Sequence, residues 1–241
     1  MKTTFLKKIA FATVALLFSA TSFAHALWIE TKSTGTKGKA QEINVYFGEF
    51  SDNDITPAAK WFSDLKDFSL VAISPSKKEI KLSATMLDNK YQALFTPEEE
   101  GVYTIVIHHL VKDVYGTMKL DYNSSTTVSV GKSETGNVAE NNSNIITVFN
   151  SKATALKKDS PVTLTVRYKN EIAKSQKVKV IAPNGWEKEL WSNDKGEVTF
   201  TPIWTGNYMA EFAITEKESG DHNGKKFDEV WQMATYLISV K

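Results

Sequence analysis

The 241-residue sequence contains no cysteine. This absence excludes a disulfide framework, thiolate chemistry and a lipid anchor attached to a cysteine. The chain also lacks an excess of either charge, since 29 basic residues face 28 acidic ones and give a net charge of +1. A nearly neutral protein has no electrostatic footprint for nucleic acid or for anionic lipid. We therefore expect neither as a partner.

Long apolar runs are scarce as well. The clearest one, residues 9–18, is shorter than the roughly 20 residues of a membrane span. Three lysines precede it and small residues follow at 22–24, which is the pattern of a cleaved secretory signal peptide over residues 1–24. Removing this segment takes away three lysines and no acid, so 26 basic residues would face 28 acidic ones, a net charge of −2. We expect an exported periplasmic protein without a membrane span after signal removal.

Familiar catalytic motifs are also missing. The sequence has no hydrolase nucleophile elbow, phosphate-binding loop, zinc-protease helix or Rossmann glycine pattern. Its serines and acids show no spacing that marks a catalytic triad. We therefore expect a binding protein and not an enzyme.

The sequence does contain many short β-rich runs separated by turn residues, which predicts an all-β fold of immunoglobulin-like sandwiches. One helix is predicted over residues 56–65, with Thr56 as its cap and Pro57 at the first helical position. The predicted strands are residues 27–30, 41–47, 68–73, 79–82, 91–95, 102–111, 145–149, 162–168, 178–181, 197–200, 208–214 and 232–240.

Two parts of the chain resemble each other. Residues 96–103 read Thr-Pro, three residues, Gly, one residue, Tyr, and residues 201–208 repeat this pattern. A tyrosine two residues after a turn glycine is typical of a corner in immunoglobulin-like sandwiches. The repeat predicts two tandem sandwich domains, residues 25–131 and 145–241. The polar residues 132–144 would form a linker or long loop between them.

Histidines are the main candidates for chemistry, because a chain without cysteine binds transition metals through nitrogen and oxygen. The four histidines are His25, His108, His109 and His222. Cleavage between Ala24 and His25 would give the mature chain a free amine and an imidazole on one residue. Cleavage after Ala26 also fits the small-residue pattern and would discard His25.

The other candidates are less specific. His108 and His109 are neighbours in a predicted strand, so their side chains point to opposite faces and at most one of them joins a given site. The sequence does not decide between them. His222 lies in a polar segment that is also typical of a solvated hairpin tip. Glu30 and Glu49 lie near apolar strand residues and could be outer metal ligands or orient a histidine, although strand-end acids commonly face solvent.

The sequence resembles a family of exported bacterial proteins, the periplasmic components of cobalt and nickel ABC-type (ECF-like) uptake systems. The resemblance rests on His-Ala-Leu-Trp-Ile-Glu at residues 25–30 after the signal segment, on Gly-Val-Tyr at 101–103 before the histidine strand, and on residues 196–237. It implies β-sandwich domains, a role in handling nickel or cobalt outside the inner membrane, and a mature chain that starts at His25.

The leading hypothesis is a nickel-binding protein that delivers Ni²⁺ to the membrane components of a nickel/cobalt ABC-type transporter, with Co²⁺ or Cu²⁺ as alternative ions. His25 would supply two nitrogens, His109 or His108 a third, and His222 or a carboxylate the remainder. One alternative is a copper carrier that uses the same chelate. Another is a metal-free, adhesin-like or carbohydrate-binding sandwich in which exposed tryptophans bind the ligand.

Overall fold

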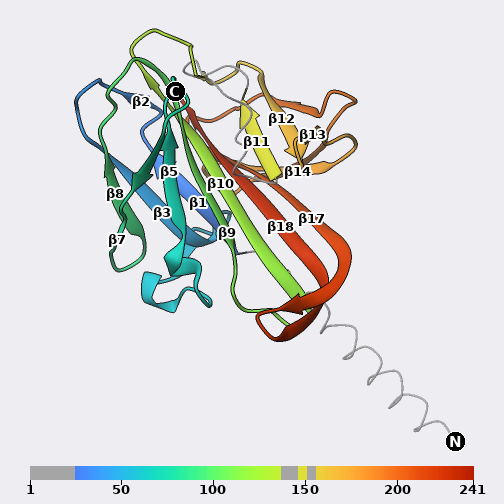
Figure 1. Ribbon diagram of the computed structural model, residues 1–241. Coiled ribbons are helices and arrows are strands. Elements are labelled where there is room, and N and C mark those ends of the chain that lie inside the picture. The colour runs from blue at the N-terminus through green and yellow to red at the C-terminus, as the bar shows by residue number, and fades with distance from the viewer. Residues whose placement is uncertain (1–24, 137–145, 151–155) are drawn as a thin grey trace, which may run out of the picture.

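A computed structural model describes residues 25–136, 146–150 and 156–241 (Figure 1). The predicted signal segment and most of the predicted linker lie outside these residues. The all-β prediction is confirmed, because the described chain forms three β-sheets and two short 3₁₀ turns. Within this part of the chain, no helix is long and apolar enough to cross a membrane.

The first sheet contains the strands that begin the described chain. Its order is β1 (Ala26–Thr31), β3 (Gln41–Glu49), β8 (Tyr91–Phe95) and β7 (Thr85–Met86), with β4 (Asp54–Ile55) paired to β3.

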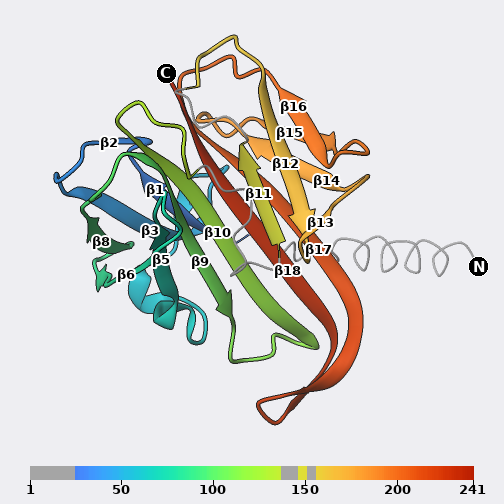
Figure 2. The same cartoon turned by 45° about the horizontal axis from the view of Figure 1, so that its top comes forward.

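The second sheet is the largest and has nine strands (Figure 2). Its order is β15 (Glu187–Trp191), β14 (Lys177–Ile181), β17 (Gly206–His222), β18 (Lys225–Val240), β10 (Met118–Val130), β9 (Gly101–Leu110), β5 (Ser69–Ile73) and β6 (Glu79–Leu82), with β2 (Thr34–Gly35) paired to β10. At its centre β10 and β18 run parallel.

The third sheet belongs to the second half of the chain. It contains β11 (Ile146–Asn150), β12 (Val162–Tyr168) and β13 (Glu171–Ile172), with β16 (Glu197–Phe200) paired to β12.

The first and third sheets cover opposite faces of the nine-stranded sheet. Side chains alternate between the two faces of a strand, and β18 shows this directly. Trp231 and Met233 belong to the core under the first sheet, whereas Ala234 and Tyr236 belong to the core under the third. The molecule therefore consists of two immunoglobulin-like sandwiches joined through one shared sheet. The division at residues 132–144 stays a prediction, and the first core also takes in Met209 from the second half.

The two halves repeat one topology. The order β6-β5-β9-β10 in the first half is mirrored by β15-β14-β17-β18 in the second, and β1-β3-β8 is matched by β11-β12-β16. The equivalent strands β10 and β18 pair in parallel, and the covering sheets lie on opposite faces. The halves are thus related approximately by a twofold rotation about an axis along these two strands.

Both halves build the predicted tyrosine corner. The Tyr103 hydroxyl accepts hydrogen bonds from the backbone N–H groups of Glu98 (3.1 Å) and Glu99 (2.9 Å). In the second half, the Tyr208 hydroxyl accepts one from the Trp204 N–H (2.9 Å) and donates one to the Trp204 carbonyl (3.1 Å). The repeated sequence pattern therefore marks equivalent corners.

The predicted helix over residues 56–65 is wrong. The segment forms two 3₁₀ turns, η1 (Ala58–Lys60) and η2 (Leu65–Asp67), separated by Trp61 in an extended conformation and by Ser63 with a positive φ of 53°. Trp61 and Leu65 are buried in the first core, and the Trp61 indole donates to the carbonyl of Thr56 (3.2 Å). Burial of these two side chains outweighs the helix propensity of the segment.

Strand β1 lies across the seam between β10 and β18. Thr235 on β18 donates to the backbone carbonyl of Leu27 (2.7 Å), and its hydroxyl lies 2.8 Å from that of Ser124 on β10. Leu27 itself is fully buried. These contacts fix the start of β1, and with it His25, relative to both halves.

Candidate functional site

His25 and Glu49 form a pair at the open end of the β1–β3 ladder. The ladder begins with Ala26 opposite Gly48, so the two residues face each other just beyond it. His25 Nδ1 lies 3.1 Å from Glu49 Oε1, and the imidazole packs against the Phe47 ring with centroids 5.4 Å apart. The His25 side chain is 50% exposed and that of Glu49 only 17%. The pair is therefore open to solvent on the histidine side.

Gly48 is required for the local backbone of this site. A Cβ at this position would lie 2.1 Å from the backbone oxygen of Asp54, because β4 pairs with β3 here. Its φ of 151° is also unfavourable for other residues. The glycine lets β4 pair closely with the end of β3 and so helps to fix Glu49.

Burial raises the pKa of Glu49 above its usual range. The charges of His25 and Lys179 lower this pKa in part, whereas those of Asp52 and Asp54 raise it further. The Glu49 carboxylate is therefore short of positive partners, and a nearby cation would favour its ionised form.

The shared sheet contributes further charges next to this pair. Lys179 Nζ on β14 lies 2.9 Å from Glu211 on β17 and 3.3 Å from Glu187 on β15. Burial raises the pKa of Glu211, whose side chain is 8% exposed, and the negative charges of Glu187 and Glu49 raise it further. Glu49, Glu187 and Glu211 together carry three negative charges against the one on Lys179, so this corner of the molecule is electronegative.

The other histidines have different partners. His109 lies on the core side of β9, with its Nε2 3.2 Å from Asp64 Oδ1. Burial alone would raise the pKa of Asp64, but a hydrogen bond from the Lys112 backbone N–H (2.8 Å) and the contact with His109 hold it below its usual range. This histidine is one-tenth exposed and belongs to a structural contact between a loop and a strand.

His108 points to the opposite face of the same strand. Its Nε2 lies 2.9 Å from Oδ1 of Asp121 on β10, and the Asp121 side chain is 4% exposed. The neighbouring histidines therefore contact two different acids on two faces of the sheet, which agrees with the alternation expected for a strand.

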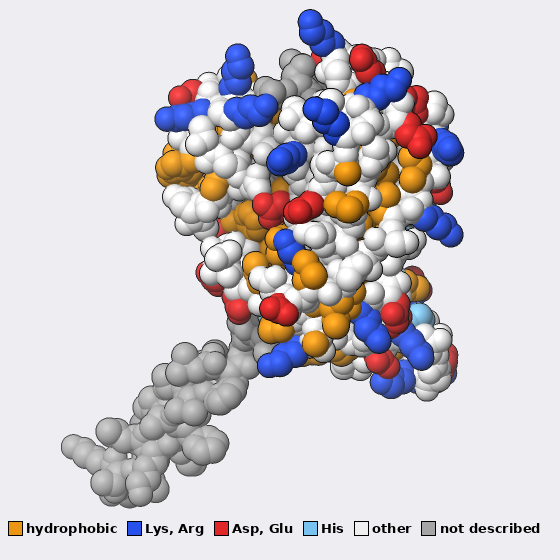
Figure 3. All heavy atoms as spheres, turned by 90° about the vertical axis from the view of Figure 1, so that its left-hand side faces the viewer, with side chains coloured by type: hydrophobic (Ala, Val, Ile, Leu, Met, Phe, Trp, Pro, Cys, Tyr) orange, Lys and Arg blue, Asp and Glu red, His pale blue; other side chains and the backbone are white. Residues whose placement is uncertain are grey.

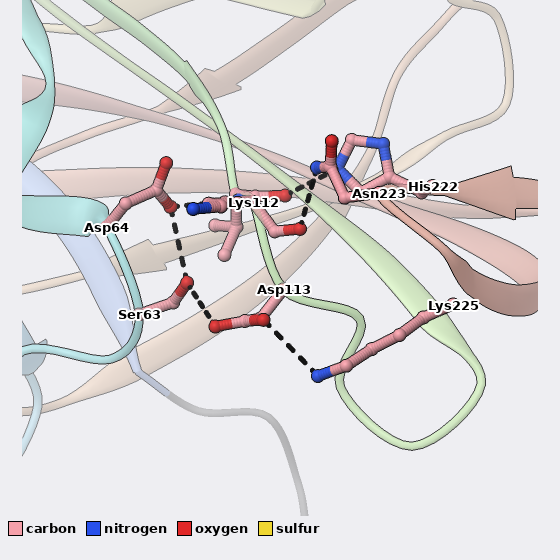
Figure 4. A network of polar contacts seen from close by, with 8 residues as sticks. Ser63, Asp64, Lys112, Asp113, His222, Asn223 and Lys225 are labelled. Carbon is pink, nitrogen blue, oxygen red and sulfur yellow. Dashed lines mark hydrogen bonds and ion pairs between the residues drawn. The ribbon is translucent and has the colours of Figure 1, made fainter.

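His222 lies at the tip of the β17–β18 hairpin, which docks on the loop after β9 (Figure 4). Its Nε2 lies 2.9 Å from the backbone oxygen of Val111. Asn223 donates to the Lys112 carbonyl (3.0 Å), and Lys225 pairs with Asp113 (3.2 Å). The hairpin tip predicted to be solvated is thus anchored to the first half of the chain.

The structure does not bring the six predicted metal residues into one site. Among residues 25–136, 146–150 and 156–241, no three histidine or acidic side chains are placed to hold one ion. His108 and His109 contact Asp121 and Asp64 and are not seen beside His25, whose partner is Glu49. Only His25 and Glu49 are paired.

Glu30, the remaining candidate, lies apart from this pair and takes part in a contact between the halves. Its Oε1 accepts a hydrogen bond from the Asn207 amide on β17 (2.8 Å). Burial raises the pKa of Glu30, whereas the bond from Asn207 and the charge of Lys90 lower it in part.

Sequence reasoning missed the acids that contact the histidines, Asp64 and Asp121. Each lies 13 or more positions away in the sequence from its histidine, so no local spacing indicates the pairing. Asp121 lies in a strand that the sequence did not predict, so its burial gave no signal in the sequence.

The distance between His25 and Glu49 is compatible with joint binding of a metal ion. Nitrogen and oxygen ligands bind zinc at about 2.0–2.2 Å, so two ligands at tetrahedral or right angles lie about 2.9–3.4 Å apart. The observed 3.1 Å falls in this range and also suits a hydrogen bond from Nδ1–H to the carboxylate. An ion could therefore replace the proton with little movement of either side chain.

No protein-family model and no curated protein matches this chain. Among solved structures, one similar chain is a mutant of Salmonella alpha-2-macroglobulin, with 12% identity over 92% of this chain and 15% of that chain and a TM-score of 0.31. Another is the native conformation of E. coli alpha-2-macroglobulin, with 13% identity over 91% of this chain and 14% of that chain and a TM-score of 0.28. The chain thus spans about one-seventh of the length of either protein.

Proposed function

We propose that the protein is a periplasmic carrier that captures a divalent transition-metal ion, Ni²⁺ in the first place, and passes it to the membrane components of a nickel/cobalt ABC-type transporter. The observation that carries the proposal is the His25–Glu49 pair, with Nδ1 and Oε1 3.1 Å apart in an electronegative corner. The ion is the cargo of the protein.

The ion would be held by three donors from two residues. When cleavage occurs before His25, the amine nitrogen and Nδ1 of this residue close a six-membered ring with the metal. Nδ1 is also the nitrogen that faces Glu49, so the carboxylate oxygen can supply the third ligand. Such nitrogen and oxygen donors suit nickel, cobalt, copper and zinc.

The local charge supports a divalent cargo. With a neutral imidazole, the ionised forms of Glu49, Glu187, Glu211 and Lys179 sum to two negative charges, and Asp52 and Asp54 add further negative charge near Glu49. A divalent cation would offset this negative charge and favour the ionised form of Glu49, whose pKa burial raises.

Release of the ion is also supported by the geometry. The His25 side chain is half-exposed, so the remaining coordination positions face solvent. A delivery protein needs ligand exchange, and an open site of three donors exchanges its ion more readily than a closed four-ligand site.

Two arguments bear on which ion the site binds. An amine and an imidazole bind Cu²⁺ more tightly than Ni²⁺ in the general order of affinity, which keeps a copper carrier as the alternative. The resemblance of residues 25–30 to nickel and cobalt uptake components favours Ni²⁺ or Co²⁺.

Intact-mass measurement of the exported protein, followed by calorimetry with Ni²⁺, Co²⁺, Cu²⁺ and Zn²⁺, tests this function. We expect a mature chain that begins at His25, and a loss of affinity of at least about 100-fold in His25→Ala, because two of the three donors disappear. Glu49→Gln should weaken binding by about tenfold, and the control His222→Gln should bind as the wild type does. A mature chain that begins at Leu27 would rule out the chelate.

A further inference from the structure

A groove of about 650 Å³ lies where the first half of the chain meets a turn of the second half. One wall comes from β1, β3 and the segment that follows β3, and the other from Pro183, Asn184 and Gly185. We propose that this groove binds a neutral oligosaccharide. The proposal does not rest on metal binding, because neither His25 nor Glu49 lines the groove.

Close contacts between the halves form this groove in advance of any ligand. Gly185 has a φ of +81°, and a Cβ there would lie 2.4 Å from the backbone oxygen of Ser51, so the two backbones touch. At the inner side, Asn207 on β17 donates to Glu30 (2.8 Å) and accepts from Ser239 (3.0 Å). A site held by backbone contact and by a hydrogen-bond chain loses little entropy when it binds.

An aromatic cluster forms the first wall. The Trp28 and Tyr46 rings are stacked with centroids 5.4 Å apart, and Phe50 meets Trp28 edge-on at 5.7 Å. Trp28 is buried, whereas Tyr46 and Phe50 are partly exposed and line the groove. The rigid rings of aromatic residues offer apolar faces at low entropic cost, and the C–H faces of a sugar ring suit such a platform.

The charged residues of the groove indicate which ligand charge it favours. Its charged lining residues are Glu30 and Asp52, and Lys90 lies beside the groove with its Nζ 5.9 Å from the centroid of the Tyr46 ring. Burial removes solvent from the Glu30 carboxylate and thereby raises its pKa. The two acidic lining residues against the one nearby lysine favour an uncharged ligand that donates hydrogen bonds to carboxylates.

The remaining polar groups of the groove favour a ligand that both donates and accepts hydrogen bonds. Ser51, Asn53 and Asn184 carry hydroxyl or amide groups that can do both. Trp28 is 3% exposed, and among the residues that the structure describes its buried Nε1–H finds no hydrogen-bond partner. Buried donors are rarely left unpaired. Sugar hydroxyls meet both requirements without carrying charge.

Binding of chitobiose, cellobiose and maltose, measured by calorimetry and by saturation-transfer NMR on the full mature chain, tests the proposal. We expect at least one of them to bind with a dissociation constant below about 10 mM. Glu30→Gln keeps the acceptor for Asn207 and should weaken binding about tenfold by removing the charge-assisted bond. Tyr46→Ala should abolish binding, with thermal unfolding as the check that the variant folds.

The matched control is Trp191→Ala, which removes a tryptophan that is 67% exposed and does not line the groove. This variant and His25→Ala should bind the sugar as the wild type does. The proposal is overturned when none of the three sugars binds, or when Glu30→Gln and Tyr46→Ala both retain wild-type affinity. Binding of choline in place of the sugars would also overturn it, because the aromatic and acidic residues would then form a site for an organic cation.

Discussion

Each half of the molecule contains a tyrosine corner, but the surroundings of the two corners differ. At the first corner, the Ser76 hydroxyl donates to Glu99 (2.8 Å), and the chain after β10 passes over Pro75, where Gly136 makes close contact. At the second corner, Trp186 and Trp204 flank a hollow of about 190 Å³, with ring centroids 6.2 Å apart. The repeat thus supplies a scaffold, and each half adds its own polar or aromatic surface.

The two halves also contribute different residues to the candidate metal site. The first half carries the His25–Glu49 pair, but the second half contributes Lys179, Glu187 and Glu211 beside it. The groove likewise takes its aromatic wall from the first half and a turn from the second. Both proposed sites therefore depend on how the halves are joined. On the face shown in Figure 3, basic side chains lie among acidic ones.

The largest expected effect comes from the two corner glycines. A Cβ at Gly101 would lie 2.6 Å from Pro75 and 2.7 Å from the Thr135 carbonyl, whereas at Gly206 it would meet only Pro183, at 2.8 Å. Both glycines have a φ near +130°, 131° and 125°. We expect Gly206→Ala to cost about 2 kcal/mol and Gly101→Ala about 3–4 kcal/mol.

Urea unfolding of both variants measures this difference. Equal losses of free energy of unfolding would mean that the segment after β10 adds nothing to the first corner, and the contrast between the corners would then disappear. Gly116→Ala is a suitable control, because a Cβ there meets no atom within 4 Å, although its φ of +60° still adds some strain.

A smaller effect is expected at the contact between the loop and β9. The folded-state pKa of Asp64 lies below its unfolded value, so its contribution to stability is present above the unfolded pKa and is lost as pH falls through the folded one. Asp64→Asn should therefore lower the free energy of unfolding at pH 7, by under about 1 kcal/mol given the partial exposure.

Thermal unfolding at pH 7 and at pH 3 tests this expectation. The difference between wild type and Asp64→Asn should shrink at the lower pH. The control Glu189→Gln breaks an exposed cross-strand pair with Lys177 and should leave stability unchanged. A difference that grows as pH falls would contradict the assigned direction of the pKa shift.

Much of the fold could be predicted from local pattern. Alternating apolar residues marked most strands, and the repeated glycine and tyrosine marked both corners. Strand β10 was not predicted, because residues 121–127 are mostly polar and show no alternation of apolar residues. Asp121 and Asn123 are nevertheless buried, since β10 lies at the seam where the halves pair. Only the tertiary arrangement indicates this.

The candidate site was predictable only in part. The position of His25 after a signal-like segment indicated a chelate, and Glu49 was a named candidate. The sequence could not show that Lys179, Glu187 and Glu211 lie near them, because each of these residues is at least 130 positions away in the sequence. Nor could it show that His109 pairs with Asp64 across the first core.

The most direct test of metal binding compares Ni²⁺ titrations of two forms of the chain that begins at His25. One form has a free amine and the other has this amine acetylated, which leaves the imidazole and Glu49 in place. Acetylation removes the basic terminal nitrogen. The chelate predicts at least about 100-fold weaker binding for the acetylated form, and equal affinities for the two forms would contradict it.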